Sequence, residues 1–244
     1  MFQPWQLDVT QVAPPRMLAR LAQWFGAGRT AGRTFAVHAS PKVDTVTSNQ
    51  PAPRFLLWID AVGGFLVCTA SRVVLGQPVP GSDVDIPIQA DLSRRHAVIR
   101  RDGEGYLIEP LREVRVGGRA IRGVTQLVDG SLIELGDSLQ LRFRKPHPLS
   151  GTARLEFVSH HRTQPAADAV LLMADSCILG PRSTSHVVCR DWADEVVLFG
   201  DGERLACRGK EALEIDGLPV GTKGHMTTSS RVCGADFTFS LEQV

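Results

Sequence analysis

A short stretch of the sequence brings together a hydroxyl, two guanidinium groups and an imidazole: Ser93-Arg94-Arg95-His96. Two kinds of chemistry use such groups. A serine and a histidine can act as nucleophile and base, but these two are three positions apart at a strand start, and no third group is fixed beside them. A hydrolase is therefore the weakest interpretation. A hydroxyl beside arginines also suits an anion with several acceptor oxygens.

Adjacent histidines, His160-His161, are the other candidates for chemistry. Neighbouring side chains point to opposite faces of a strand, and no carboxylate or cysteine lies nearby at ligand spacing. We therefore expect no metal site and no cofactor.

Short apolar runs separated by turn residues surround these groups from residue 55 onward. They are rich in Val, Ile and Leu and bounded by Gly, Asp and Pro, which favours a β-sandwich. Asp102-Gly103, Gly117-Gly118 and Asp129-Gly130 predict tight turns, because these residues tolerate positive φ. The runs expected to be strands are residues 55–59, 64–70, 72–75, 96–100, 106–109, 114–116, 131–135 and 139–143.

The order of these motifs resembles a known family. Leu75-Gly76-Gln77 comes first, Ser93-Arg94-Arg95-His96-Ala97 follows, and Gly117-Gly118 and Leu135-Gly136 come after it. This pattern is similar to the forkhead-associated (FHA) domain, a β-sandwich that generally binds phosphothreonine peptides. The resemblance covers roughly residues 55–147.

The resemblance implies a set of site residues. An FHA domain usually has a phosphate-binding arginine directly after the glycine that ends a strand, and here Gln77 follows Gly76. The serine that also binds phosphate is present as Ser93. His96 matches a histidine that is usually structural. Glutamine offers donors without charge, so phosphate binding is expected to be weakened.

Two further positions depart from the family pattern. The loop Glu109-Pro110-Leu111-Arg112-Glu113 is short and lacks an asparagine, and Gly117-Gly118 stands where Asn-Gly is usual. Arg94 and Arg112 are candidates to restore positive charge at the same end of the sandwich. Each is also an ordinary exposed arginine, for which a surface role is the simpler interpretation.

Net charge, cysteine spacing and hydropathy disfavour several classes of function. The formal net charge is +1, which gives no case for nucleic-acid binding by the whole chain. The five cysteines are widely spaced and form no Cys-x-x-Cys motif, so we expect buried thiols in a reducing compartment. Without a leader-like segment or a long apolar run, a cytoplasmic location and no membrane binding are expected.

Four segments are predicted along the chain. Residues 1–54 comprise an amphipathic helix at residues 16–25 and a flexible linker rich in Gly, Ser, Thr and Pro. The FHA domain occupies residues 55–147 and a connector residues 148–164. Residues 165–244 are predicted to form a second, degenerate FHA-like sandwich, because four of their segments parallel the first copy at an offset of about 100 residues. We expect 55–147 to fold alone; failure would indicate one fused domain.

The predicted function is a non-enzymatic protein-interaction module that recognises phosphothreonine peptides with weakened affinity. The alternative is a pseudo-FHA scaffold that binds an unphosphorylated protein partner, or itself, through a sheet edge or the helix. The sequence does not indicate an oligomeric state.

Overall fold

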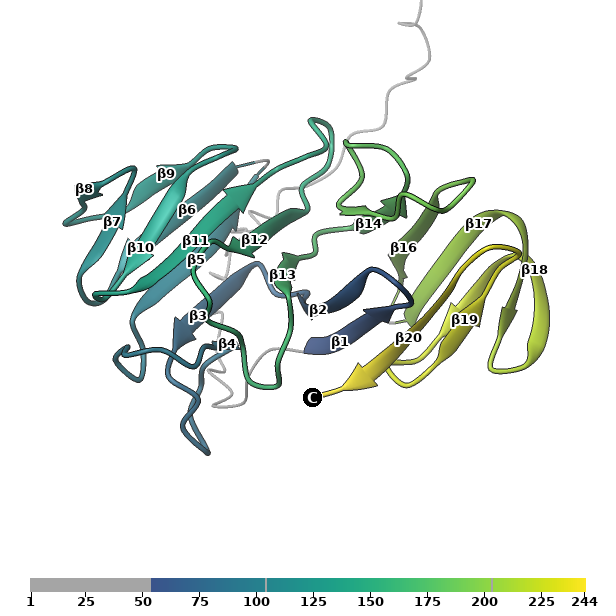
Figure 1. Ribbon diagram of the computed structural model, residues 1–244, viewed down its shortest axis with the longest axis horizontal. Helices are drawn as coiled ribbons and strands as arrows, with labels where there is room; N and C mark the ends of the chain where they lie inside the picture. Colours follow the sequence, from purple (N-terminus) through teal and green to yellow (C-terminus); the bar gives the residue numbers. More distant parts are fainter. Residues whose placement is uncertain (1–53, 104, 203) are drawn as a thin grey trace, which may run out of the picture. The chain divides into compact units, whose positions relative to one another are not determined.

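The computed structural model describes residues 54–103, 105–202 and 204–244, all within one compact unit. Every regular element in these residues is a β-strand (Figure 1), which confirms the predicted all-β class. The predicted helix at residues 16–25 and its linker lie outside the described residues. The described part contains no helix that could span a membrane.

The strands form two hydrogen-bonded sheets. The smaller sheet has the order β4 (Ile86–Pro87), β3 (Arg72–Gly76), β5 (Ala97–Asp102), β6 (Gly105–Pro110) and β9 (Thr125–Leu127). The larger sheet has the order β15 (Val187–Val188), β14 (Ser176–Gly180), β16 (Val196–Asp201), β17 (Arg204–Ile215), β19 (Arg231–Cys233), β20 (Thr238–Gln243), β1 (Arg54–Ile59), β2 (Gly63–Cys68), β13 (Ala169–Leu172), β12 (Ala153–Phe157), β11 (Leu139–Arg144), β10 (Leu132–Leu135), β7 (Val114–Val116) and β8 (Arg119–Ala120), with β18 (Leu218–Met226) paired to β17.

The predicted tight turns are present. Gly117 and Gly118 join β7 to β8 with φ of +59° and +77°, as a two-residue hairpin with two left-handed positions requires. Gly103 and Gly130 also have positive φ. Local sequence chemistry therefore sets where the chain reverses direction.

A first hydrophobic core lies between the two sheets. It joins buried side chains of the smaller sheet, such as Leu75 and Ile99, to those of β10 and β11, such as Ile133 and Leu141. Tyr106 lies at one side of this core, where its hydroxyl can donate its one proton to the carbonyl oxygen of Gly151 (2.8 Å) or of Leu172 (3.1 Å). This packing of two sheets forms the sandwich on which the predicted site loops stand.

A second hydrophobic core lies among β14, β16, β17, β19 and β20. Its pairing repeats that of the first half: β14 pairs β15 in parallel and β16 antiparallel, as β3 pairs β4 and β5. Strand β12 lies in the predicted connector and pairs with β11 and β13. The residue limits of the four segments remain predictions.

Strands β1, β2 and β13 pack against both cores. Leu56 and Leu66 belong to the first core, whereas Leu57, Phe65 and Leu171 belong to the second. Alternate residues of a strand point to opposite faces, so apolar residues at successive positions bury both faces of these strands. Strand β1 pairs with β20 and β2 pairs with β13, and Figure 1 shows the three strands between the two halves. We call β1, β2 and β13 the shared layer.

Candidate functional site

Main-chain hydrogen bonds gather three loops at one end of the first sandwich. The Gln77 amide, directly after β3, donates to the Ser93 carbonyl oxygen (3.2 Å). The amide of Arg112, in the loop between β6 and β7, donates to the His96 carbonyl oxygen (3.0 Å). The structure thus brings Gln77, Ser93 and Arg112 to neighbouring loops.

His96 ties two of these loops together from a buried position. The ring is only 4% exposed; Nδ1 accepts a hydrogen bond from the Ser93 amide (3.3 Å) and Nε2 lies 2.8 Å from the Glu113 carbonyl oxygen. Because a carbonyl only accepts, Nε2 carries the proton of the neutral ring. The lone pair on Nδ1 is therefore occupied by a backbone amide and is not directed at the Ser93 hydroxyl. This geometry disfavours the serine–histidine hydrolase.

Gly76 permits the close approach of the β3 end to the β4–β5 loop. A Cβ at this position would lie 1.9 Å from the Arg94 carbonyl oxygen and 3.1 Å from that of Ser93. No side chain fits there. The glycine thus fixes the separation between Gln77 and Ser93.

The side chains at this end differ in the contacts they make. Gln77 and Ser93 are half-buried and Arg94 is exposed, and none of their side-chain polar atoms forms a hydrogen bond within the described residues. Arg95 forms an ion pair with Asp83 (3.1 Å), and Arg112 donates to the Leu111 carbonyl oxygen (2.8 Å). Neutral donors at 77 and 93 and a guanidinium at 94 are thus free to meet a ligand.

The structure places Gly117 apart from this group. It lies at the end of β7 away from the Arg112 loop, and the three residues of β7 span about 10 Å. Gly117 and Gly118 are exposed, and a Cβ at either would have no atom within 4 Å. Their observed role is to form the hairpin turn.

Residues 73–136 match the family model for the FHA domain. The chain contains an FHA domain. The match begins in β3 and ends directly after β10, so it includes Gln77, Ser93 and His96. No curated protein matches the chain.

Solved structures similar to the chain include a phosphopeptide complex and an FHA domain. Mycobacterium tuberculosis EmbR, solved in complex with a low affinity phosphopeptide, is 30% identical over 41% of this chain and 26% of its own, with a TM-score of 0.28. The chain thus spans about a quarter of that protein. The FHA domain of the CT664 protein from Chlamydia trachomatis is 28% identical over 34% of this chain and 89% of its own, with a TM-score of 0.25.

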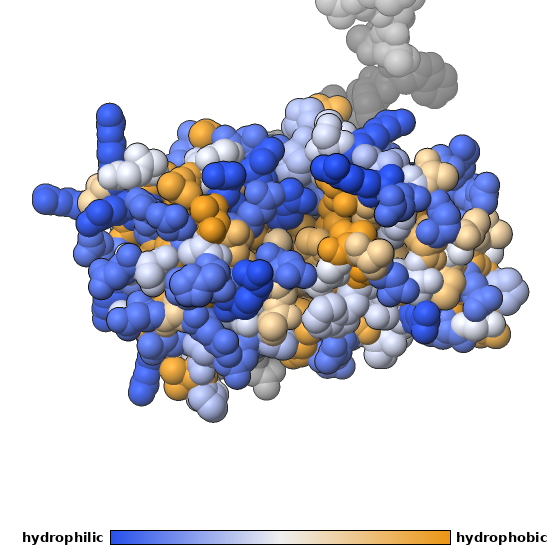
Figure 2. Space-filling model, viewed as in Figure 1, coloured by the Kyte–Doolittle hydropathy of each residue, from blue (hydrophilic) through white to orange (hydrophobic). Residues whose placement is uncertain are grey.

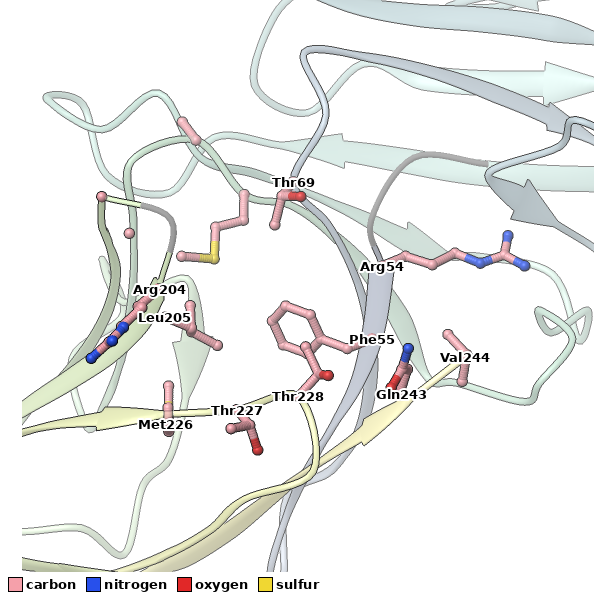
Figure 3. A pocket seen from close by; sticks show the side chains of 14 residues that line it. Arg54, Phe55, Thr69, Arg204, Leu205, Met226, Thr227, Thr228, Gln243 and Val244 are labelled. Atoms are coloured by element: carbon pink, nitrogen blue, oxygen red, sulfur yellow. The ribbon is translucent and has the colours of Figure 1, made fainter. Parts of the chain in front are cut away.

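The structure also contains a cavity away from the predicted site residues. This cavity of about 600 Å³ is lined by Phe55, Leu205 and Met226 among others (Figure 3), and none of the predicted site residues lines it. The Arg54 side chain points away from this cavity and donates to the carbonyl oxygens of Val84 (2.9 Å) and Asp85 (2.7 Å).

The buried cysteines offer no reactive thiol in this structure. Four of the five are buried, and burial raises the pKa of Cys68, Cys177 and Cys189 to about 12 and that of Cys207 to about 11. A thiol with such a pKa stays protonated near neutral pH, whereas the thiolate is the nucleophile. The FHA domain loops therefore remain the best candidate site.

Two contributors to the FHA site were not found from the sequence. The Asp83–Arg95 ion pair joins the β3–β4 loop to the β4–β5 loop, and Asp85, 6% exposed, accepts a hydrogen bond from the Val74 amide (2.7 Å). Nothing in a single sequence marks an ion pair between two loops, because it depends on how they meet.

Proposed function

We propose that this protein is a non-enzymatic interaction module whose FHA domain binds phosphothreonine peptides weakly. The observation that carries the proposal is the free Ser93 hydroxyl beside Gln77, at joined loops of a segment that matches the FHA family. A phosphothreonine brings nearly two negative charges and three acceptor oxygens. Ser93 and Gln77 supply neutral donors, and Arg94, next to Ser93, is the candidate to supply positive charge.

The expected weakness follows from residue 77. A charge-assisted hydrogen bond contributes about 1.5–3 kcal/mol and is roughly twice as strong as a neutral one. Replacing the arginine that is usual in FHA domains by glutamine therefore costs about tenfold to a hundredfold in affinity. Arg94 offsets part of this loss only if its flexible side chain reaches the phosphate.

Calorimetric titration at fixed salt tests the proposal. A phosphothreonine peptide and its unphosphorylated twin are titrated into wild type, Gln77→Arg and Gln77→Asn. We expect weak, phosphate-dependent binding by wild type, about tenfold or more tighter binding by Gln77→Arg, and no gain with Gln77→Asn, because only arginine adds charge. Equal binding of both peptides by wild type and Gln77→Arg would reject phosphate recognition.

One observation favours the alternative of a pseudo-FHA scaffold. The amides of Leu111 and Arg112 both donate to the His96 carbonyl oxygen (3.0 Å each), and Leu111 packs against the buried Val74 and Val98. This short loop is held close to the sheet and carries no asparagine. If neither wild type nor Gln77→Arg binds the phosphopeptide, recognition of an unphosphorylated partner becomes the better proposal.

We further propose that residues 165–244 are a degenerate FHA-like repeat that binds no phosphate. Its support is the repeated strand pairing and a matching close approach: a Cβ on Gly180 would lie 2.7 Å from Cγ of Glu195. Both glycines thus closely approach the segment before the antiparallel partner strand, Gly180 at the Glu195 side chain and Gly76 at the Arg94 main chain. A carboxylate there, 3.5 Å from the Arg182 guanidinium, repels phosphate and neutralises the nearest cation.

A further inference from the structure

The β7–β8 hairpin carries an arginine back to the ligand end of the FHA domain. Val116 pairs with Arg119 beside the Gly117-Gly118 turn, and the Ile121 amide donates to the Val114 carbonyl oxygen (3.0 Å). Residue 122 therefore lies beside the start of β7, where the 111–113 loop ends. Arg119 stays at the turn, about 10 Å away along the three residues of β7.

Arg122 is exposed, and its guanidinium has no hydrogen bond or ion pair with any described residue. The acidic side chain next to this position, Glu113, already pairs with Arg115 (3.0 Å). Figure 2 shows hydrophilic residues over much of the face in view, including its β7–β8 end. Arg122 thus adds positive charge without an acidic partner from its own domain.

The 111–113 loop links Arg122 to the proposed phosphate site. The Glu113 carbonyl oxygen accepts from His96 Nε2 (2.8 Å), and the other ring nitrogen accepts from the Ser93 amide. A ligand at Ser93 therefore has Arg94 on the β4–β5 loop and Arg122 beyond the 111–113 loop. Two exposed arginines on separate elements flank the same loop cluster.

We propose that this site prefers phosphothreonine peptides with acidic residues beside the phosphothreonine, and that Arg122 is a specificity-determining residue for them. The inference rests on the proposed function. The attraction is between exposed charges, so it is modest and screened beyond about 8 Å at physiological salt. The charge of Arg122 attracts the flanking acidic residues, whereas the phosphate itself is bound at Ser93.

The test compares two phosphothreonine peptides that differ only in flanking residues, glutamate in one and glutamine in the other. Each is titrated calorimetrically into wild type, Arg122→Gln and Arg119→Gln at low and physiological salt. Arg119 is a matched control because it is an exposed arginine without a described partner on the same hairpin. We expect wild type to favour the glutamate peptide about fivefold, Arg122→Gln to lose most of this preference, and Arg119→Gln to keep it.

Four outcomes overturn the inference. If wild type binds both phosphopeptides equally but rejects their unphosphorylated forms, the preference fails while the proposed function stands. If no phosphopeptide binds, both fail. Equal losses in Arg119→Gln and Arg122→Gln would assign the effect to overall charge. Unequal melting temperatures of Arg122→Gln and wild type would assign it to folding.

Discussion

The shared layer predicts that the two hydrophobic cores unfold together. Leu56 and Leu57 are neighbours on β1; they are 1% and 0% exposed and belong to the first and second core respectively. Replacing either by alanine removes buried methyl groups and leaves a cavity, which costs about 2–5 kcal/mol. Total stabilities of about 5–15 kcal/mol make either loss a large fraction. For a unit of this size, a loss of about 3 kcal/mol lowers the melting temperature by about 6–12 °C.

The measurement is urea unfolding of wild type, Leu56→Ala and Leu57→Ala, combined with amide hydrogen exchange in β5 and β16. These strands contribute Ile99 to the first core and Leu198 to the second. With a shared layer, each variant lowers protection in both strands and shows one transition. Exposed Trp58, 38% exposed, supplies a control in Trp58→Phe, which we expect to change stability little.

A different pattern would refute the reasoning. If Leu57→Ala lowers protection in β16 while β5 keeps its wild-type value, the cores unfold independently. Residues 55–147 would then be separable, as the sequence leads one to expect. If the two cores instead unfold together, a fragment of residues 55–147 exposes the apolar face formed by Phe55, Leu57, Phe65 and their neighbours. This exposure lowers its stability by about 1.5–3 kcal/mol for each large side chain.

Two other predictions concern histidines. His96→Ala should lower the free energy of unfolding by about 1–3 kcal/mol, because the Ser93 amide and the Glu113 carbonyl lose their partner. Ser93→Ala should leave the melting temperature nearly unchanged. Equal losses of melting temperature in the two variants would contradict these roles. His186, 0% exposed, has a pKa lowered from 6.5 to about 4, first by burial and then by the charges of His147 and Arg154. Its folded-state pKa is below the unfolded value, so the unfolded chain takes up the proton first and stability falls as the pH drops from about 6.5 to 4. His186→Asn should remove up to about 3 kcal/mol of that fall in urea titrations, and identical pH profiles would reject the assignment.

Much of the FHA domain could be predicted because its signals are local. The runs at 72–75, 106–109, 114–116 and 139–143 lie within observed strands, and the turn glycines have the required φ. Strands β4, β8 and β9 were not expected. They have two or three residues each, and such short strands are defined by their pairing partners, which leave no periodic pattern in the sequence.

The shared layer shows why the domain arrangement was harder to predict. The apolar run from Phe55 to Leu57 reads as an ordinary core strand, because burial on one face or on two gives similar short runs. Only the pairing of β1 with β20, in which Trp58 lies opposite Ser240, reveals that β1 also packs against the second core. Likewise, the pairing of β8 with β7 places Arg122 beside the 111–113 loop, and the spacing of residues in the sequence does not predict this position.

The arrangement of the FHA site separates affinity from stability. His96 and Gly76 hold the three loops through a buried ring and main-chain contacts. Gln77, Ser93 and Arg94 project from those loops, and their side chains form no hydrogen bond with the described residues. Changes at 77, 93 or 94 should therefore alter ligand affinity while leaving the fold intact, whereas changes at 76 or 96 should lower stability and disturb the site together with it. An FHA domain can thus keep a glutamine at 77 without loss of stability, which makes the residue at this position a matter of which ligand is bound and how tightly.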